Sequence, residues 1–260
     1  MNKQQTGEAG EKREKAKRPL IIGHRGAAGE APENTLASFQ LAADQGCDMV
    51  ELDIHLSADD KLVVCHDASL DRTTTQAGLI RSMDYEAISK ADAGSKFAEA
   101  FRGQRAPLLE EVYALLSEHI QINVEAKDSY NGALDEALDA FLQQPGRMER
   151  TIVSSFDHKL LARLKARMPE LRIGLLYAAS LIAPAAYAGL MGSDVFSLHP
   201  HYSGIDAEDT AEAAKANIAV YPYTVNEEQD FLALLDMQVD GIITDFPGRL
   251  KQLLDKQWGN

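Results

Sequence analysis

Titratable side chains gather at points where apolar, strand-like stretches of the sequence end. Along the chain these residues are His24, Arg25, Glu51, Asp53, Glu125 and Lys127. Successive side chains of a strand point to opposite faces, so Glu51 and Asp53 share one face of the stretch 49–56 and apolar residues occupy the other. If Glu125 joins them at about 5 Å, each pair of carboxylates repels by roughly 3 kcal/mol at an effective dielectric near 20. Such an acidic trio requires a cation.

The ligand atoms of the trio select the kind of cation. Glu51, Asp53 and Glu125 offer only oxygen atoms, which favour a hard ion over Zn²⁺. The sequence therefore predicts one divalent cation, Mg²⁺ or Ca²⁺, with Mn²⁺ as a further candidate. The alternative is a buried ionic network in which the acids pair only with Arg25 and Lys127, and this leaves three acids facing two bases.

Two histidines accompany the acids. His24 follows the first strand-like stretch, and His66 ends a short apolar run that begins at Lys61. An unperturbed imidazole titrates near pH ~6.5, so two of them can share general-base and general-acid work at neutral pH. A single histidine is more often structural, but the joint position of these two beside the acids favours catalysis.

The strand-like stretches alternate with helical patterns, which is typical of a parallel sheet with crossover helices. The stretches that read as strands are Leu20–Gly23, Met49–Leu56, Gln121–Glu125, Thr151–Ser155, Arg172–Tyr177, Val195–Leu198, Ala219–Val225 and Gly241–Thr244. Apolar residues recur at helical spacing in Asn34–Gln45, His158–Met168, Ala207–Ala216, Glu227–Met237 and Pro247–Gln257. Eight parallel strands can close, so we predict the α/β class and a (β/α)8 TIM-type barrel with its chemistry at the carboxyl ends of the strands.

One segment departs from this alternation. Lys61–His66 reads as a strand that returns beside the second one, and residues 67–107 are long, polar and irregular. Long excursions after a barrel strand lie over the catalytic face, so we expect this insertion after the second strand to shape the substrate mouth. The alternative is a surface flap without that role.

Composition and charge limit the class of protein and its partners. A chain of 260 residues can form one barrel domain, which we place at 19–260 behind a flexible charged tail at 1–18. The formal net charge of −14 disfavours nucleic acid and anionic membranes as partners. A substrate that carries a phosphate would be repelled as well, so it needs a local cation and local basic side chains.

The sequence carries no pattern of a signal peptide or a membrane span, and Cys47 and Cys65 make no disulfide framework. These features indicate a cytoplasmic protein without a stable membrane anchor. The outer helices of a barrel can pair, so a homodimer is compatible with the sequence.

Several short motifs resemble those of the glycerophosphodiester phosphodiesterase family, in the family order. They are His24-Arg25-Gly26, Pro32-Glu33-Asn34-Thr35 with Phe39, Glu51-Leu52-Asp53-Ile54, His66-Asp67, Leu70-Asp71-Arg72-Thr73, Asn123-Val124-Glu125-Ala126-Lys127, Ser154-Ser155-Phe156, Tyr223-Thr224-Val225-Asn226 and Thr244-Asp245. The resemblance covers nearly everything after Arg18. Departures are small, such as Ala126 between Glu125 and Lys127, and they do not involve a charged residue.

The resemblance implies a role for each residue of the site. Glu51, Asp53 and Glu125 would hold the metal, and His24 and His66 would act as the acid–base pair. Substrate would be bound by Arg25 and Lys127, which contact phosphoryl oxygens, and by Tyr223 as an apolar wall, although core packing is an equal interpretation of Tyr223. The products would be sn-glycerol 3-phosphate and an alcohol, released from a small glycerophosphodiester.

Two other functions compete with this one. A related barrel could act on lysophospholipid head groups, as a lysophospholipase D does. The large aromatic residues of the insertion are only Phe97 and Phe101, so water-soluble diesters are preferred. A non-catalytic barrel that binds a phosphodiester is the third hypothesis, and the presence of both histidines and all three acids argues against it.

Four further residues have competing interpretations. Asn34 is a candidate helix cap, and His55 is either a pocket residue or a hydrogen-bonded filler. His199 ends a predicted strand, so contact with substrate is one interpretation of it, and Arg72 either supports the insertion or binds phosphate.

Overall fold

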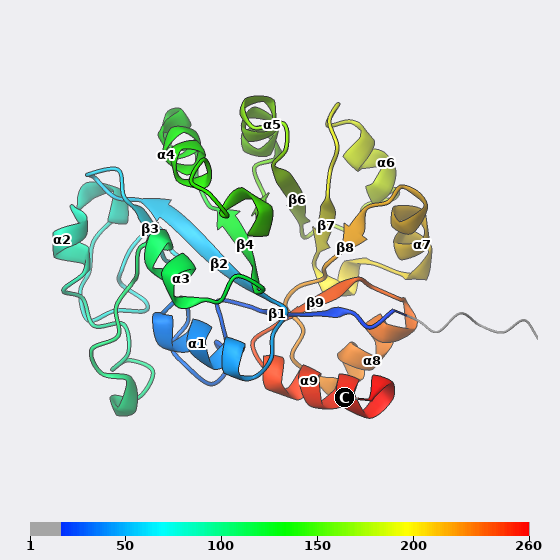
Figure 1. Ribbon diagram of the computed structural model, residues 1–260, viewed down its shortest axis with the longest axis horizontal. Coiled ribbons are helices and arrows are strands. Elements are labelled where there is room, and N and C mark those ends of the chain that lie inside the picture. Colours follow the sequence, from blue (N-terminus) through cyan, green and yellow to red (C-terminus); the bar gives the residue numbers. More distant parts are fainter. Residues whose placement is uncertain (1–16, 260) are drawn as a thin grey trace, which may run out of the picture.

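The computed structural model describes residues 17–259, and eight parallel strands form a nearly closed barrel with helices around it (Figure 1). The parallel strands are β1 (Leu20–Gly23), β2 (Met49–Leu56), β4 (Gln121–Ala126), β5 (Thr151–Ser155), β6 (Arg172–Tyr177), β7 (Ser197–Pro200), β8 (Ala219–Val220) and β9 (Gly241–Thr244). Their order is β8-β7-β6-β5-β4-β2-β1-β9, so neighbours along the chain are neighbours in the sheet. The predicted fold class is confirmed. Apart from Lys17 and Arg18, the predicted charged tail lies outside the described residues.

The seam of the barrel lies between β8 and β9. β8 ends at Val220, two residues before Pro222, whose missing N–H faces β9 and leaves a gap in the hydrogen bonds across the seam. Across the seam, Ile243 N–H donates to the Pro222 carbonyl at 3.0 Å and Val225 N–H donates to the Ile243 carbonyl at 2.9 Å. These two bonds hold the chain after β8 against β9. The strand β8 itself is shorter than the predicted strand Ala219–Val225.

Apolar side chains on the outer face of each strand pack against the helices. In β2, Val50, Leu52, Ile54 and Leu56 all belong to the main hydrophobic core. The helices are α1 (Leu36–Asp44), α2 (Tyr85–Ile88), α3 (Leu109–Leu115), α4 (Ala133–Leu142), α5 (His158–Arg167), α6 (Pro184–Gly189), α7 (Ala207–Lys215), α8 (Glu228–Asp236) and α9 (Pro247–Trp258). The five predicted helices match α1, α5, α7, α8 and α9, whereas α3, α4 and α6 were not among the predicted helices.

The inner face of the barrel is partly polar. Glu51, Asp53 and His55 alternate with the outer residues of β2, and every residue of this strand is buried. Small apolar contacts fill the lower interior, where Ile22, Met49 and Ile152 form a separate cluster. The acids therefore lie above an apolar plug, at the carboxyl ends of the strands.

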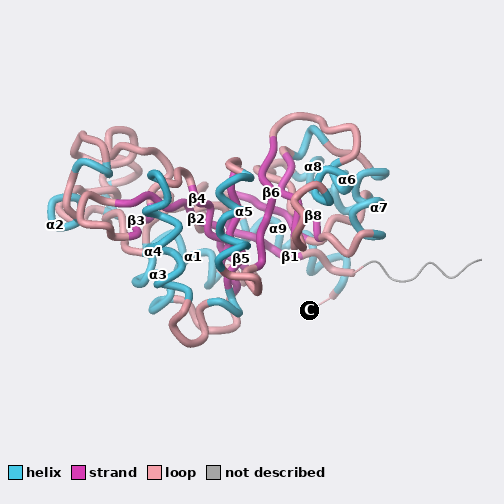
Figure 2. The backbone as a smooth tube through the Cα atoms, turned by 90° about the horizontal axis from the view of Figure 1, so that it is seen from above, coloured by secondary structure: helices cyan, strands magenta, loops and turns pink. Residues whose placement is uncertain are grey.

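The segment after β2 forms a body of its own at one side of the barrel, opposite α7 in the view from above (Figure 2). It begins with β3 (Leu62–Val64), which pairs antiparallel with β2. Residues 67–107 hold α2 and two short 3-10 turns, at Ile80–Ser82 and Glu99–Phe101. A small cluster that includes Val63, Leu70 and Ile80 packs beneath them. Whether this insertion shapes the substrate mouth stays a prediction.

A second strand boundary predicted from the sequence, besides that of β8, is wrong. The predicted strand Val195–Leu198 is shifted, because β7 begins at Ser197 and continues through His199 to Pro200. The ladder explains the shift, since Ser197 is the first residue in register with both Gly174 of β6 and Ala219 of β8. Within residues 17–259, the helices are all too short or too polar to cross a lipid bilayer.

Candidate active site

Three carboxylates converge at the carboxyl ends of β2 and β4. Glu51 and Asp53 lie on the inner face of β2, and Glu125 lies opposite Asp53 in the β2–β4 register. One oxygen from each side chain falls within 4.8 Å of the others. Glu51 and Asp53 expose only 4% and 1% of their surface, so water screens the mutual repulsion poorly. The structure thus brings together the three predicted metal ligands.

Glu51 is held by the backbone of the first loop. The Arg25 N–H donates to Glu51 Oε2 at 2.9 Å, which requires Arg25 to adopt a φ of 51°. Gly26 follows with a φ of 86°, and a Cβ atom there would lie 2.4 Å from Ser38 Oγ. The His-Arg-Gly triplet therefore forms a tight turn that presents a backbone donor to the acid, and only glycine fits its third position.

Asp53 receives most of the positive charge of the site. Its Oδ2 accepts a hydrogen bond from Asn34 Nδ2 at 2.8 Å and lies 3.3 Å from Arg25 Nε, and its Oδ1 lies 3.2 Å from Lys127 Nζ. Burial would raise the pKa of Asp53, but Lys127 and then Arg25 outweigh burial and lower the pKa to about 2. Asp53 is therefore ionised in the folded protein.

Glu125 and Glu51 lack a comparable balance. Lys127 Nζ donates to Glu125 Oε1 at 2.6 Å, yet burial and then the charge of Asp53 raise the pKa of Glu125 to about 7. Burial, Asp53 and Glu125 together raise the pKa of Glu51 well above its usual value. Among the described residues, the only partner within ion-pair distance of Glu51 is His24, at 4.0 Å.

These contacts decide between the two interpretations of the trio. The ionic network with Arg25 and Lys127 exists, but it compensates Asp53 and Glu125; Glu51 receives no contact from the Arg25 or Lys127 side chain within ion-pair distance. Asp53 Oδ1 is buried and accepts no hydrogen bond. All the available donor atoms are carboxylate oxygens, which suit a hard divalent cation. The residues present therefore fit the predicted cofactor, and the network alone does not explain them.

His24 is oriented by a carboxylate that directly follows the last strand. Its Nδ1 lies 2.7 Å from Asp245 Oδ1, and Asn226 Nδ2 donates to Asp245 Oδ2 at 2.7 Å. Burial would raise the pKa of Asp245, but hydrogen bonds from His24 and Asn226 lower it. An ionised Asp245 accepts the Nδ1 proton, so the Nε2 lone pair is available on the side of Glu51.

His66 is oriented in the same way by its neighbour in the chain. Its Nδ1 lies 2.7 Å from Asp67 Oδ1, and about a third of its side chain is exposed. Arg72 donates to both oxygens of Asp67, at 2.7 and 3.1 Å. The two histidines thus share one arrangement, in which a carboxylate fixes Nδ1 and leaves Nε2 free.

The histidines, the basic residues and two of the acids line one cavity of about 230 Å³. Its lining includes His24, Arg25, Glu51, His66, Asn123, Glu125, Lys127, Ser154, Phe156, Leu176, Tyr223, Thr224 and Ile243. Tyr223 and Phe156 meet edge to face, with ring centroids 6.1 Å apart. A cavity with charged groups on one side and two aromatic rings among its walls suits a small polar substrate that also has a carbon skeleton.

Residues with competing interpretations are settled by their contacts. Asn34 is not the helix cap, because Thr35 caps α1 and the Asn34 amide bonds to Asp53. His55 is a hydrogen-bonded filler between the Tyr130 hydroxyl and the His66 carbonyl. His199 is fully buried inside the barrel next to Ser197, and it does not line the cavity. Arg72 supports the insertion through carboxylates.

Several residues of the site had no role assigned from the sequence. Asp245 and Asn226 orient His24, and Asn123 and Ser154 contribute buried polar atoms to the cavity without a hydrogen-bond partner of their own. In the sequence they stand within the family-like motifs, as polar residues at or near strand ends, and nothing there gave them a role of their own. Such a position does not say which polar side chains will meet across the barrel.

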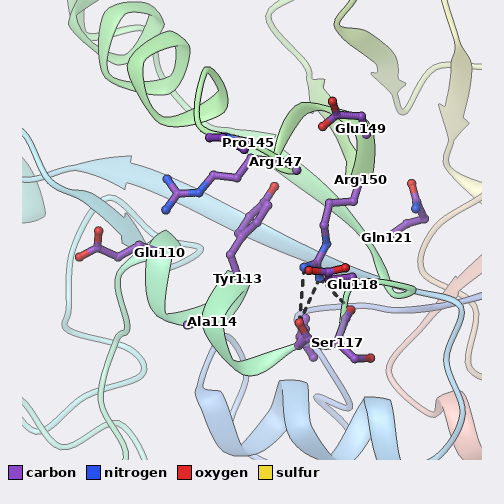
Figure 3. Close-up of a pocket in the computed structure, with 12 residues that line it drawn as sticks. Glu110, Tyr113, Ala114, Ser117, Glu118, Gln121, Pro145, Arg147, Glu149 and Arg150 are labelled. Carbon is purple, nitrogen blue, oxygen red and sulfur yellow. Dashed lines mark hydrogen bonds between the residues drawn. The ribbon is translucent and has the colours of Figure 1, made fainter.

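A larger hollow of about 600 Å³ lies at the other end of the strands, beside the start of β4 and β5 (Figure 3). Arg150 lines it, but its guanidinium group donates to the backbone carbonyls of Leu116, Ser117 and Ile120. Three glutamates line the same hollow. Arg147 lines it as well, and it donates to the Phe141 carbonyl. Because the backbone engages both arginines, this hollow lacks the convergent chemistry of the cavity above the acids.

The chain resembles proteins of one family over most of its length. Residues 24–249 match the model of the glycerophosphoryl diester phosphodiesterase family. A glycerophosphodiester phosphodiesterase of Caldanaerobacter subterraneus subsp. tengcongensis is 40% identical over 91% of this chain and 98% of its own. A lysophospholipase D of Rattus norvegicus is 30% identical over 90% of this chain and 85% of its own.

The fold is also shared with solved structures. A phosphodiesterase of Oleispira antarctica, in complex with the product sn-glycerol-3-phosphate, superposes with a TM-score of 0.84 at 30% identity. The alignment covers 91% of this chain and 97% of that one.

Proposed function

This chain belongs to the glycerophosphoryl diester phosphodiesterase family, and we propose that it hydrolyses glycerophosphodiesters to sn-glycerol 3-phosphate and an alcohol with one divalent cation. It is an enzyme, a phosphoric diester hydrolase. The observation that carries the finer proposal is the buried trio of acids beside two carboxylate-bound histidines in one cavity.

The cation would be held by Glu51, Asp53 and Glu125. When bound, it withdraws charge from the phosphoryl oxygens and so stabilises the transition state. The oxygen ligands favour Mg²⁺ or Ca²⁺, and Mn²⁺ is the third candidate. Asn34 supports this site from outside by holding Asp53 Oδ2 in place.

Arg25 and Lys127 would bind the phosphoryl oxygens of the substrate. Both side chains line the cavity and are only 17% exposed, so their charges act at low screening. Lys127 now pairs with Asp53 and Glu125, and Arg25 pairs with Asp53 and with Glu33 outside the trio. A phosphate group bound beside the trio would lie within reach of the same donors. Tyr223 and Phe156 would contact the carbon atoms of the glycerol group.

His24 and His66 would exchange the protons of the reaction at Nε2. One histidine takes the proton of the attacking hydroxyl, from water or from a neighbouring glycerol hydroxyl, as the new phosphorus–oxygen bond forms. When the glycerol hydroxyl attacks, the product is a cyclic phosphate, which water opens in a second step of the same kind. The other gives a proton to the alcohol oxygen as the old phosphorus–oxygen bond breaks. The hydrogen bonds from Nδ1 to Asp245 and Asp67 support this proposal, because a proton held on Nδ1 leaves the Nε2 lone pair to the base, and a carboxylate beside Nδ1 stabilises the imidazolium that serves as the acid.

The experiment is a coupled assay of glycerol 3-phosphate release from several glycerophosphodiesters. We expect turnover with Mg²⁺, Ca²⁺ or Mn²⁺ and loss of turnover with a chelator. Release that is unaffected by the chelator would refute the role of the cation, and no release with any of the three ions would favour a binding protein.

Lysophospholipids are the alternative substrates. The 30% identity to a lysophospholipase D favours their inclusion in the assay, and the exposed ring of Phe156 at the cavity is compatible with an apolar chain. We expect faster cleavage of glycerophosphocholine than of lysophosphatidylcholine, and the reverse order would assign the enzyme to lipids. The cytoplasmic location and the homodimer stay predictions from the sequence.

A further inference from the structure

Arg72 of the insertion donates four hydrogen bonds to two carboxylates. Its Nη1 and Nη2 donate to Glu33 Oε2 and Oε1 at 2.7 and 2.8 Å. Its Nε and Nη2 donate to Asp67 Oδ2 and Oδ1 at 2.7 and 3.1 Å. Each carboxylate is therefore bound through both of its oxygens, an arrangement that the planar guanidinium fork permits and an ammonium group does not.

The two carboxylates connect Arg72 to two residues of the active site. Asp67 Oδ1 bonds to His66 Nδ1 at 2.7 Å, and Glu33 Oε1 accepts from Arg25 Nη1 at 2.8 Å. The chain of contacts runs from His66 through Asp67, Arg72 and Glu33 to Arg25. His66 and Arg25 both line the cavity, whereas Arg72 does not.

The backbone around Arg72 is well anchored, although its side chain is 48% exposed. Leu70 is fully buried in the apolar cluster of the insertion, and its carbonyl accepts from both the N–H and the hydroxyl of Thr74. Lys96 Nζ donates to the Asp71 carbonyl at 2.6 Å. A fixed backbone lets the guanidinium group hold its two carboxylates in one place.

An exposed ion pair usually contributes little to stability, so stability does not account for this arrangement. Its contribution is geometric. A carboxylate that bonds a histidine can rotate about its side-chain torsions, and a second bidentate partner removes that freedom. Groups that orient a reacting side chain often alter activity by about 10- to 100-fold when they are removed.

We propose that Arg72 is a positioning residue that sets two sides of the active site at once, the His66 imidazole through Asp67 and the Arg25 guanidinium through Glu33. This inference rests on the proposed function, in which His66 transfers a proton and Arg25 binds the phosphoryl group. Arg72 itself does not contact the substrate. The insertion therefore contributes to catalysis through this one side chain.

The contact chain has two arms, one from Arg72 through Asp67 to His66 and one from Arg72 through Glu33 to Arg25. Each arm makes its own prediction. Asp67→Asn acts mainly on His66, because Glu33 keeps its bonds to Arg72 and Arg25, so it lowers kcat and leaves KM close to that of the wild type. Glu33→Gln disturbs the Arg25 arm, so its main effect is a higher KM. Arg72→Gln combines the two effects, and Arg72→Lys does not restore them, because a lysine supplies the charge without the fork.

The test measures kcat and KM for glycerophosphocholine with the full chain and saturating Mg²⁺, together with the nitrogen-15 spectrum of the His66 ring. We expect Arg72→Gln to lower kcat by about 10- to 100-fold and to raise KM several-fold. In the spectrum, we expect the proton of neutral His66 on Nδ1 in the wild type and a mixture of tautomers in the variant. Arg102→Gln is the matched control, because Arg102 lies on the same insertion and, within residues 17–259, forms an ion pair with Glu99 alone.

Unfolding midpoints of all variants confirm that each is folded, and Arg72→Lys serves as the second variant. The inference would be overturned if both Arg72 variants kept kcat and KM within twofold of the wild type and kept the wild-type tautomer of His66, while His66→Ala was inactive. That result would leave the proposed function intact. An active His66→Ala enzyme would instead remove the proposed role of His66.

Discussion

Glu125→Gln tests the acidic trio, because its effect on the stability of the protein should change sign when a divalent cation binds. In the folded, cation-free chain, burial and then Asp53 raise the pKa of Glu125 from the usual 4.5 to about 7. One pH unit of difference corresponds to about 1.4 kcal/mol, so the change is worth roughly 3 kcal/mol. The folded chain binds this proton more tightly than the unfolded chain does. The stability of the cation-free protein therefore falls as the pH rises from 4.5 to about 7.

A glutamine at this position removes the cost of the buried charge. Lys127 loses its partner at 2.6 Å but keeps Asp53 at 3.2 Å, which makes the gain smaller than the full amount. At about pH 8 with a chelator, we expect Glu125→Gln to be more stable than the wild type by about 1–3 kcal/mol. A divalent cation at about 1,000 times its Kd reverses the order, because it stabilises the wild type by about 4.1 kcal/mol.

Urea unfolding followed by circular dichroism measures both effects, at about pH 5 and about pH 8, with chelator or with Mn²⁺. At about pH 5 the wild type keeps the Glu125 proton, so the two chelated proteins should differ little. Glu136→Gln is the control, because Glu136 is exposed on α4 and should change stability by less than about 0.5 kcal/mol. If Glu125→Gln is less stable than the wild type in chelator at about pH 8, the repulsion argument is refuted.

Three further perturbations test the remaining parts of the site. His24→Ala and His66→Ala should each lower turnover by about 10²- to 10⁴-fold and leave Mn²⁺ affinity in calorimetry unchanged, and a weaker affinity would contradict the separation of acids from histidines. Asn34→Ala should weaken Mn²⁺ binding by about 10- to 100-fold through the loss of a partner of Asp53, and an unchanged affinity would show that Asn34 does not position that ligand. Gly26→Ala should lower the free energy of unfolding in urea by about 2–4 kcal/mol, because its φ is 86° and the new Cβ would overlap Ser38. A neutral effect would contradict the required turn.

The fold followed from the sequence because its signals are repeated along the chain. β1, β2, β5, β6 and β9 have the predicted bounds, since strands buried on both faces read as short apolar runs between polar turns. Most errors lie where the pattern is weak, although α4 was missed despite ten residues with a clear apolar face. β8 stops before Pro222, and α3 and α6 are short helices with few turns over which a period can appear.

The site divides in the same way between local and non-local information. Glu51 and Asp53 share a face because of strand periodicity, and Glu125 joins them because neighbouring parallel strands end at the same edge. Asp245, by contrast, lies 221 residues from its partner His24 along the chain. Such a contact depends on barrel closure and on side-chain rotamers, which no local pattern specifies.

Arg72 illustrates the same difficulty within a loop. From the sequence, a basic residue in the insertion was compatible with phosphate binding or with support of the loop. The structure places its guanidinium group between Asp67 and Glu33, on two segments that are not adjacent in the chain. Only the packed insertion decides between the two interpretations.

The central claim is that Glu51, Asp53 and Glu125 bind one divalent cation, and an anomalous difference map of the protein crystallised with Mn²⁺ tests it most directly. We predict a single strong peak in the cavity, within about 2.0–2.6 Å of an oxygen from each of the three side chains. A peak elsewhere, or a cavity whose acids bind only Arg25 and Lys127 at saturating Mn²⁺, would contradict the account.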